Sequence, residues 1–248
     1  MANFVLVHGA FQGGWVWKTV AAQLRGEGHE VYTPTLTGAG ERMHLLDPSV
    51  NLGVYCHDVA NLVYFEGLDD VILVGSSYAG MVIDAVAIKI RHKISRLVYL
   101  DAVVPEKGKS FVELAGPDFE LMLRASTVGW QVHPWPLEVF GIRCEEQKRW
   151  FSSRLVHFPL RAFDSVIPDV PPYGEIFRTY IHCTEHKNGF IKRTAARCKL
   201  AGWEYYELAT GHCPMVTAPE DVAVMLNGLA VGDVGREALP VEMQSNVH

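Results

Sequence analysis

This sequence has few positively charged residues. It contains 22 Lys and Arg residues and 28 Asp and Glu residues, which gives a formal net charge of -6 at pH 7. Because the sequence has no run of basic residues, it predicts no basic surface that could bind a polyanion, which excludes a nucleic-acid partner. The chain also lacks an apolar run long enough to cross a bilayer and a charged leader with a cleavage site after Met1. We therefore expect a soluble, cytoplasmic protein with no membrane partner.

Cysteine is scarce as well. The chain has five cysteines, an odd number, widely scattered and without C-x-x-C spacing. This pattern excludes a disulfide framework and a zinc site, and it is typical of a reducing compartment. No metal site is expected.

The sequence is rich in short apolar runs that alternate with helical patterns. Hydrophobic residues make up 49% of the chain, enough for a large core. Such alternation predicts an α/β fold with a mostly parallel sheet of about six strands and helices on both faces. The expected strands lie at 4–7, 30–33, 71–74, 96–100, 179–183 and 203–208.

The alternation stops between Pro105 and Ile176. This segment is rich in aromatic residues and prolines, with helical spacing over 111–124 and 137–154. We interpret it as a helical cap, 105–176, inserted into a core made of 1–104 and 177–231. Residues 232–248 are expected to form a loose tail.

The third apolar run ends in small residues and leads into a helical pattern. A sharp strand-to-helix turn strains its central residue and needs small neighbours two positions to either side. Ser77 meets this condition with Gly75 and Ala79, whereas Ser76 would have Val74 and Tyr78. Ser77 is therefore the predicted nucleophile.

A serine nucleophile needs a base, and the base needs an acceptor that holds its tautomer. His212 follows the sixth expected strand and comes after the serine in chain order, so we predict it as the base. Asp101, at the end of the fourth strand, is the preferred acid, and Glu185 after the fifth strand is the alternative. Asp164 and Asp169 in the expected cap are weaker candidates.

The loop after the first strand has a separate predicted role. An oxyanion hole takes one backbone N–H from the residue after the nucleophile and one from this loop. These would be the amides of Tyr78 and Ala10, with His8 fixing the loop. The side chains of Phe11, Tyr78, Trp130 and Trp135 are predicted to bind an apolar substrate.

Three motifs in this order resemble a known family. They are the first strand and loop at 4–10 with Gly13, Gly14, Trp15 and Trp17; the strand and turn at 70–81; and Gly211–His212. They resemble the branch of the α/β-hydrolase superfamily that contains plant salicylate-binding methylesterases, hydroxynitrile lyases and small bacterial esterases. The resemblance extends to about Leu229 and implies the α/β-hydrolase fold and a serine hydrolase that needs no cofactor.

Departures from the family pattern bear on the chemistry. Family members have His at the position of Ser76 and Gly at that of Ala79. In the family, the turn after the fifth strand usually carries the catalytic acid, an aspartate, and this turn is Thr184-Glu185-His186 here. The histidine in place of an aspartate shifts the expected acid towards Asp101. Gly9 and Cys213 stand where the lyases have threonine and lysine, which favours hydrolysis.

The expected function is hydrolysis of a carboxylic ester or lactone of a small apolar or aromatic compound through an acyl-enzyme. The alternatives are a carbon–carbon lyase or hydrolase, a cofactor-free dioxygenase on the same fold, and a non-catalytic sensor of a small ligand. The expected partner is this small molecule, and a homodimer is left open.

Overall fold

The computed structural model describes residues 1–171 and 176–232. Its centre is a six-stranded sheet in the order β2-β1-β3-β4-β8-β9, and every neighbouring pair is parallel. The strands are β1 Asn3–Val7, β2 Glu30–Tyr32, β3 Val71–Ser76, β4 Ile94–Leu100, β8 Phe177–Cys183 and β9 Glu204–Leu208. The predicted α/β class and strand number are confirmed.

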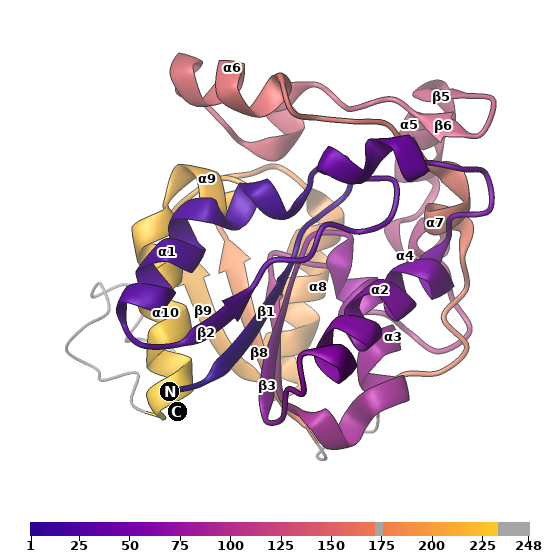
Figure 1. Ribbon diagram of the computed structural model, residues 1–248. Coiled ribbons are helices and arrows are strands. Elements are labelled where there is room, and N and C mark those ends of the chain that lie inside the picture. The colour runs from indigo at the N-terminus through magenta and orange to yellow at the C-terminus, as the bar shows by residue number, and fades with distance from the viewer. Residues whose placement is uncertain (172–175, 233–248) are drawn as a thin grey trace.

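Helices cover both faces of this sheet (Figure 1). Helix α1 packs against α10 on one face, and α2 packs against α3 on the other, with α8 beside β8 and β9. The helices and 3-10 turns of this part are η1 Gly14–Trp17, α1 Lys18–Gly26, η2 Gly40–Leu45, α2 Leu52–Phe65, α3 Ala79–Ile90, η3 Arg91–Lys93, α8 Gly189–Leu200, α9 Pro214–Thr217 and α10 Pro219–Val231.

The core sits between sheet and helices because the central strands are apolar on both sides. All six residues of β3 are buried, as are four of the five in β1. A strand buried on both faces shows a continuous apolar run, which is why these two were recognisable in the sequence. Helix starts are equally local, since the Asn51 side chain accepts hydrogen bonds from the amides of Gly53 and Val54 at the start of α2.

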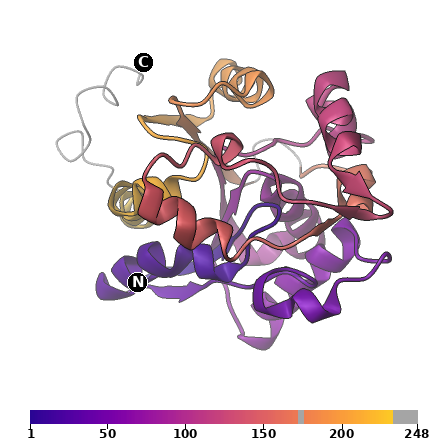
Figure 2. The ribbon, with the colours of Figure 1, turned by 90° about the horizontal axis from the view of Figure 1, so that it is seen from above.

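The segment between β4 and β8 lies over the carboxyl ends of the strands (Figures 1 and 2). It contains α4 Phe111–Ala115, α5 Pro117–Ala125, β5 Thr127–Val128, β6 Gln131–Val132, η4 Leu137–Phe140, α6 Glu145–Ser152, β7 Phe158–Pro159 and α7 Leu160–Asp164. We call this segment the cap.

The cap differs from its prediction in two respects. The two expected helices are each divided, because Gly116 and Gly141 have φ values of +90° and +71°, which a helix cannot contain. A three-stranded antiparallel sheet, in the order β5-β6-β7, also makes the cap a mixed structure and not a purely helical one. Such short strands give no periodicity in the sequence.

Two further expectations concern the chain end and membranes. The predicted tail, 232–248, lies outside the described residues except for Gly232. Within the described part of the chain, no helix combines the length and apolar character needed to span a membrane.

Candidate active site

Ser77 stands on the turn between β3 and α3. Its φ of +55° is in the left-handed region, a strained conformation for a residue with a side chain. A Cβ added to Gly75 would lie 2.7 Å from the carbonyl oxygen of Ala79, so the strand can turn into the helix only with glycine there. Ser77 therefore lies on the strained strand-to-helix turn that was predicted from the small residues at positions 75 and 79. The neighbouring Ser76 is fully buried, and its Oγ has no hydrogen-bond partner among the described residues.

His212 lies in the loop between β9 and α9 and reaches back over the sheet. Its Nε2 is 2.9 Å from Ser77 Oγ. Its Nδ1 is 2.6 Å from Oδ2 of Asp101, and a carboxylate accepts at that position, so Nδ1 carries the proton. The free lone pair of Nε2 therefore points at the serine hydroxyl, the arrangement that a general base requires.

Asp101 follows β4 directly and is fully buried. Its φ of +47° turns the carboxylate back towards the sheet edge, where Oδ1 accepts from the amide of Cys183 at 3.0 Å and from His182 Nδ1 at 3.1 Å. Burial alone would raise the pKa of this carboxyl. Its contacts with His182, His186 and His212 outweigh burial and hold the pKa of Asp101 far below its usual range.

Glu185, the alternative acid, points elsewhere. Its carboxylate pairs with the exposed Arg143 at 3.1 Å. The next residue, His186, is the one that turns inward, and its Nε2 lies 2.7 Å from Asp101 Oδ2. The geometry therefore offers Asp101, and not Glu185, to His212. The weaker candidates also lie apart, since Asp164 pairs with Arg124 and Asp169 with Lys107.

The loop after β1 approaches the same turn. Among the described residues, the Ala10 and Tyr78 amides have no hydrogen-bond acceptor, so both can serve a ligand. His8 holds this loop: its Nδ1 donates to the carbonyl of Gly9 at 2.8 Å, and its Nε2 accepts from the amide of Leu36 at 3.1 Å. Burial lowers the pKa of His8 to about 4, although the Gly9 carbonyl and Glu41 act in the opposite direction. His8 is thus a neutral structural link between two loops.

Aromatic rings pack between this turn and the cap. The ring of Phe11 contacts those of Trp135, Phe158 and Phe163, with centroid distances of 4.7, 5.7 and 6.4 Å. The cap is fastened here, because the amide of Val156 donates to the carbonyl of Phe11 at 3.0 Å. We call Phe11, Trp135, Phe158 and Phe163 the aromatic wall.

Two predicted substrate contacts lie differently. Tyr78 is buried, and its hydroxyl donates to the carbonyl of Ala162 at 2.9 Å, so it fastens the cap to the core. Burial raises the pKa of Tyr78 well above its usual value. Trp130, which is part of the cap, is half-buried and has no ring contact with the aromatic wall among the described residues. Its carbonyl accepts from the amide of Leu160, also in the cap.

Asp101, His186 and His212 are also the described residues that could hold a metal ion, since their ligand atoms lie within 4.8 Å of one another. Zinc lies about 2.0–2.2 Å from such atoms, so tetrahedral ligands are separated by roughly 3.3 Å. Asp101 Oδ2 is only 2.6 Å from His212 Nδ1 and 2.7 Å from His186 Nε2. Both separations are too short for an ion to lie between these atoms.

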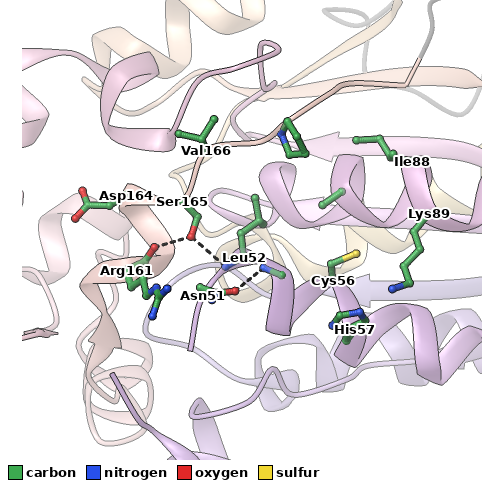
Figure 3. A pocket seen from close by; sticks show the side chains of 13 residues that line it. Asn51, Leu52, Cys56, His57, Ile88, Lys89, Arg161, Asp164, Ser165 and Val166 are labelled. Carbon is green, nitrogen blue, oxygen red and sulfur yellow. Dashed lines mark hydrogen bonds between the residues drawn. The ribbon is translucent and has the colours of Figure 1, made fainter. Parts of the chain in front are cut away.

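One cavity lies apart from these residues. It is a crevice of about 580 Å³ between α2, α3, α7 and the chain that follows α7. Figure 3 shows the side chains that line it. Ser165 closes one side, because its Oγ accepts from the amide of Leu52 at 3.4 Å and donates to the carbonyl of Arg161 at 2.6 Å (Figure 3). Ser77, Asp101 and His212 do not line this crevice.

The comparison with known proteins decides the family. A model of the alpha/beta hydrolase family matches residues 4–224. The chain belongs to this family. The predicted resemblance is therefore confirmed.

Two curated relatives of this alpha/beta hydrolase are a carbendazim hydrolyzing esterase and a plant protein. The esterase, from Nocardioides sp. (strain SG-4G), is 37% identical over 245 residues, which cover 92% of this chain and 100% of the relative. Salicylic acid-binding protein 2 of Nicotiana tabacum is 34% identical over 207 residues, covering 75% and 79%. An extracellular alpha/beta-hydrolase from a Paenibacillus species superposes with a TM-score of 0.74 at 23% identity, covering 91% of this chain and 98% of that one, which shows the shared fold.

Sequence reasoning missed three residues of the site of this hydrolase. His182 and His186 flank Asp101, and Gln12, which is 1% exposed, donates from Nε2 to Cys213 Sγ at 3.4 Å. His182 looked like an ordinary strand residue, and Gln12 carried no motif. His186 was named in the sequence analysis only because it stands where the family has an aspartate, and no role was predicted for it. Their roles depend on contacts across 81 and 201 positions of the chain, which no local pattern reveals.

Proposed function

We propose that this protein is a serine carboxylesterase, with Ser77 as nucleophile, His212 as general base and then acid, and Asp101 as the group that orients His212. The observation that carries the proposal is the double contact of His212, whose two ring nitrogens lie 2.9 Å from Ser77 Oγ and 2.6 Å from Asp101 Oδ2. This arrangement activates a hydroxyl that is otherwise a poor nucleophile at neutral pH.

The proposed reaction has two halves. Nε2 of His212 takes the proton of Ser77 as Oγ attacks the ester carbonyl, and the amides of Ala10 and Tyr78 donate to the oxyanion. Asp101 stays ionised and stabilises the imidazolium. His212 then returns the proton to the leaving alcohol, and a water molecule activated in the same way releases the acid from Ser77.

The proposed substrates are esters or lactones with an apolar or aromatic acyl group. The residues beside the predicted oxyanion hole support this, because the half-buried Trp135 packs against Phe11, the residue after Ala10, so the surroundings of the Ala10 amide are apolar. Two relatives are named as a carbendazim hydrolyzing esterase and a methyl jasmonate esterase of Vitis vinifera. We therefore include carbendazim and methyl jasmonate in the panel of test substrates.

The test compares two adjacent serines. A fluorophosphonate probe should label the wild type on Ser77, and Ser77→Ala should lose both the label and at least about a thousandfold of nitrophenyl ester turnover. Ser76→Ala is the matched control. Because the Ser76 hydroxyl has no partner among the described residues, its loss should leave labelling and turnover within about twofold of wild type.

The outcome also separates the alternative functions. An active preparation that hydrolyses the panel without labelling of Ser77 would contradict the acyl-enzyme. Turnover of carbon–carbon or heteroaromatic substrates with Ser77→Ala still active would favour proton abstraction by His212. A ligand that binds without turnover in either protein would favour a sensor.

A further inference from the structure

The carboxylate of Asp101 is surrounded by three imidazole rings. Oδ2 meets His212 Nδ1 at 2.6 Å and His186 Nε2 at 2.7 Å, while Oδ1 meets His182 Nδ1 at 3.1 Å. The rings form a chain, with centroids 5.7 Å apart between His182 and His186 and 5.5 Å apart between His186 and His212. One histidine is enough for the proposed catalysis, so the other two need a separate explanation.

The backbone sets the tautomer of His186. The amide of Asn188 donates to His186 Nδ1 at 3.1 Å, so the neutral ring carries its proton on Nε2, the nitrogen facing Asp101. Asn188 is itself held, because its side chain accepts from the amides of Phe190 and Ile191 at the start of α8. His186 Nε2 lies 2.7 Å from Asp101 Oδ2, but it makes no well-aligned hydrogen bond to this or any other acceptor in the described chain.

Among the titratable groups described around His186, Asp101 is the one that carries an unpaired negative charge. The thiol of Cys183, on β8, is kept neutral because burial, and then the charge of Asp101, raise its pKa well above the usual value. Burial likewise raises the pKa of Cys213, beside His212, although Gln12 opposes this. Glu185 pairs with Arg143 outside the cluster. The imidazoles of His182 and His212 also lie beside His186. Glu207, opposite His182 on β9, is paired with Lys199.

When several N–H donors face one carboxylate, the carboxylate attracts each of them less strongly than it would attract a single donor. Proton donors beside Asp101 disperse its charge and so reduce the stabilisation it gives to a protonated His212. His186 acts on the oxygen that His212 uses, whereas His182 acts on the other oxygen. The effect of His186 on His212 should therefore be the larger.

We propose that His186 and His182 are positioning residues that hold the Asp101 carboxylate and set the pH at which His212 loses its proton and becomes a base. This inference rests on the proposed function for its catalytic meaning. The placement of the proton on His212 can be measured without turnover.

The main test uses His186→Leu and His186→Gln. Leucine removes the N–H, whereas the Gln side-chain amide can place a donor near the position of Nε2. In the nitrophenyl ester assay, we expect His186→Leu to move the acid limb of the kcat/KM profile to higher pH by about half to one unit. KM should stay within about twofold, and His186→Gln should restore most of the wild-type profile.

A second readout is independent of activity. The C2 proton of His212, assigned by its absence in His212→Gln, can be titrated by NMR in Ser77→Ala and in Ser77→Ala combined with His186→Leu. We expect the midpoint to move upward with the same sign. If ester turnover proves not to need Ser77 but this midpoint moves, the proposed function fails and the inference stands.

Other results would overturn the inference. A purely structural role of His186 predicts lower kcat in both His186 variants with an unmoved acid limb and an unmoved NMR midpoint. If His186→Leu does not fold, His182→Leu takes its place. That variant should move the limb in the same direction by a smaller amount, with His182→Asn keeping a donor as control, and an unmoved limb there overturns the proposal.

Discussion

Gly211, the residue before His212, lies directly against Gly141 of the cap. A Cβ added to Gly211 would be 2.4 Å from the Gly141 carbonyl oxygen, closer than atoms can approach. The amide of Cys213 donates to the carbonyl of Phe140 at 3.0 Å, and Gln147 Nε2 donates to the carbonyl of Val216 at 2.9 Å. The cap thus holds the His212 loop on both sides of the histidine.

Gly211→Ala should therefore displace His212 without touching it chemically. The methyl group must push the cap and the loop apart, and a displacement of about 1 Å at a catalytic base can reduce turnover by roughly a hundredfold. We expect kcat/KM for a nitrophenyl ester to fall at least about tenfold and the melting temperature to fall as well.

Gly26→Ala serves as the control for this prediction. Gly26 has no atom within 4 Å of an added Cβ and ends α1 far from the site, so activity and melting temperature should remain close to wild type. Equal activity of Gly211→Ala and wild type would show that the cap contact does not position His212.

Asp101→Asn and Glu185→Gln should behave very differently. An Asn at 101 can offer its NH₂ group to His212 Nδ1, which favours the tautomer with the proton on Nε2 and leaves no base for Ser77. We expect kcat to fall by about a thousandfold or more. Glu185 pairs with an exposed Arg143 side chain, so Glu185→Gln should change kcat by less than about threefold.

Circular dichroism and melting curves of both variants would show that the comparison concerns folded protein. A folded Asp101→Asn protein with near wild-type turnover, combined with a hundredfold loss in Glu185→Gln, would transfer the acid role to Glu185.

Asp84 predicts a pH dependence of stability away from the site. It lies on α3 and accepts from the Tyr99 hydroxyl at 2.5 Å. Burial raises the pKa of Asp84 to about 7, although Tyr99 and Arg178 act against it. Between about pH 4 and pH 7 the folded chain keeps a proton that the unfolded chain has lost, so the contribution of Asp84 to the free energy of unfolding falls as pH rises.

Asp84→Asn removes this contribution and keeps an acceptor for Tyr99. The stability of Asp84→Asn relative to wild type should grow by on the order of 3 kcal/mol between pH 4.5 and pH 8. Urea unfolding at both pH values measures it, with the exposed Glu27→Gln as control. A difference independent of pH would show that Asp84 is already ionised in the folded protein at low pH.

The part of the fold that could be predicted comes from local signals. The apolar runs of β1 and β3 and the small residues around Ser77 act within a few positions of the chain, so their pattern is visible in the sequence. The position of Asp101 at the end of β4 was also predictable, since polar residues that follow parallel strands gather at one edge. The cap was less predictable, because Gly116 and Gly141 break helical spacing that otherwise looked continuous.

The sequence by itself determined the α/β fold, the family and the candidate residues Ser77, His212 and Asp101, because each depends on a short motif or on strand order. Only the tertiary structure decided between Asp101 and Glu185 as neighbour of His212, turned His186 inward, and tied the Tyr78 hydroxyl to Ala162. These outcomes depend on contacts between segments distant in the chain, and the direction in which a side chain leaves its loop is set by packing against them.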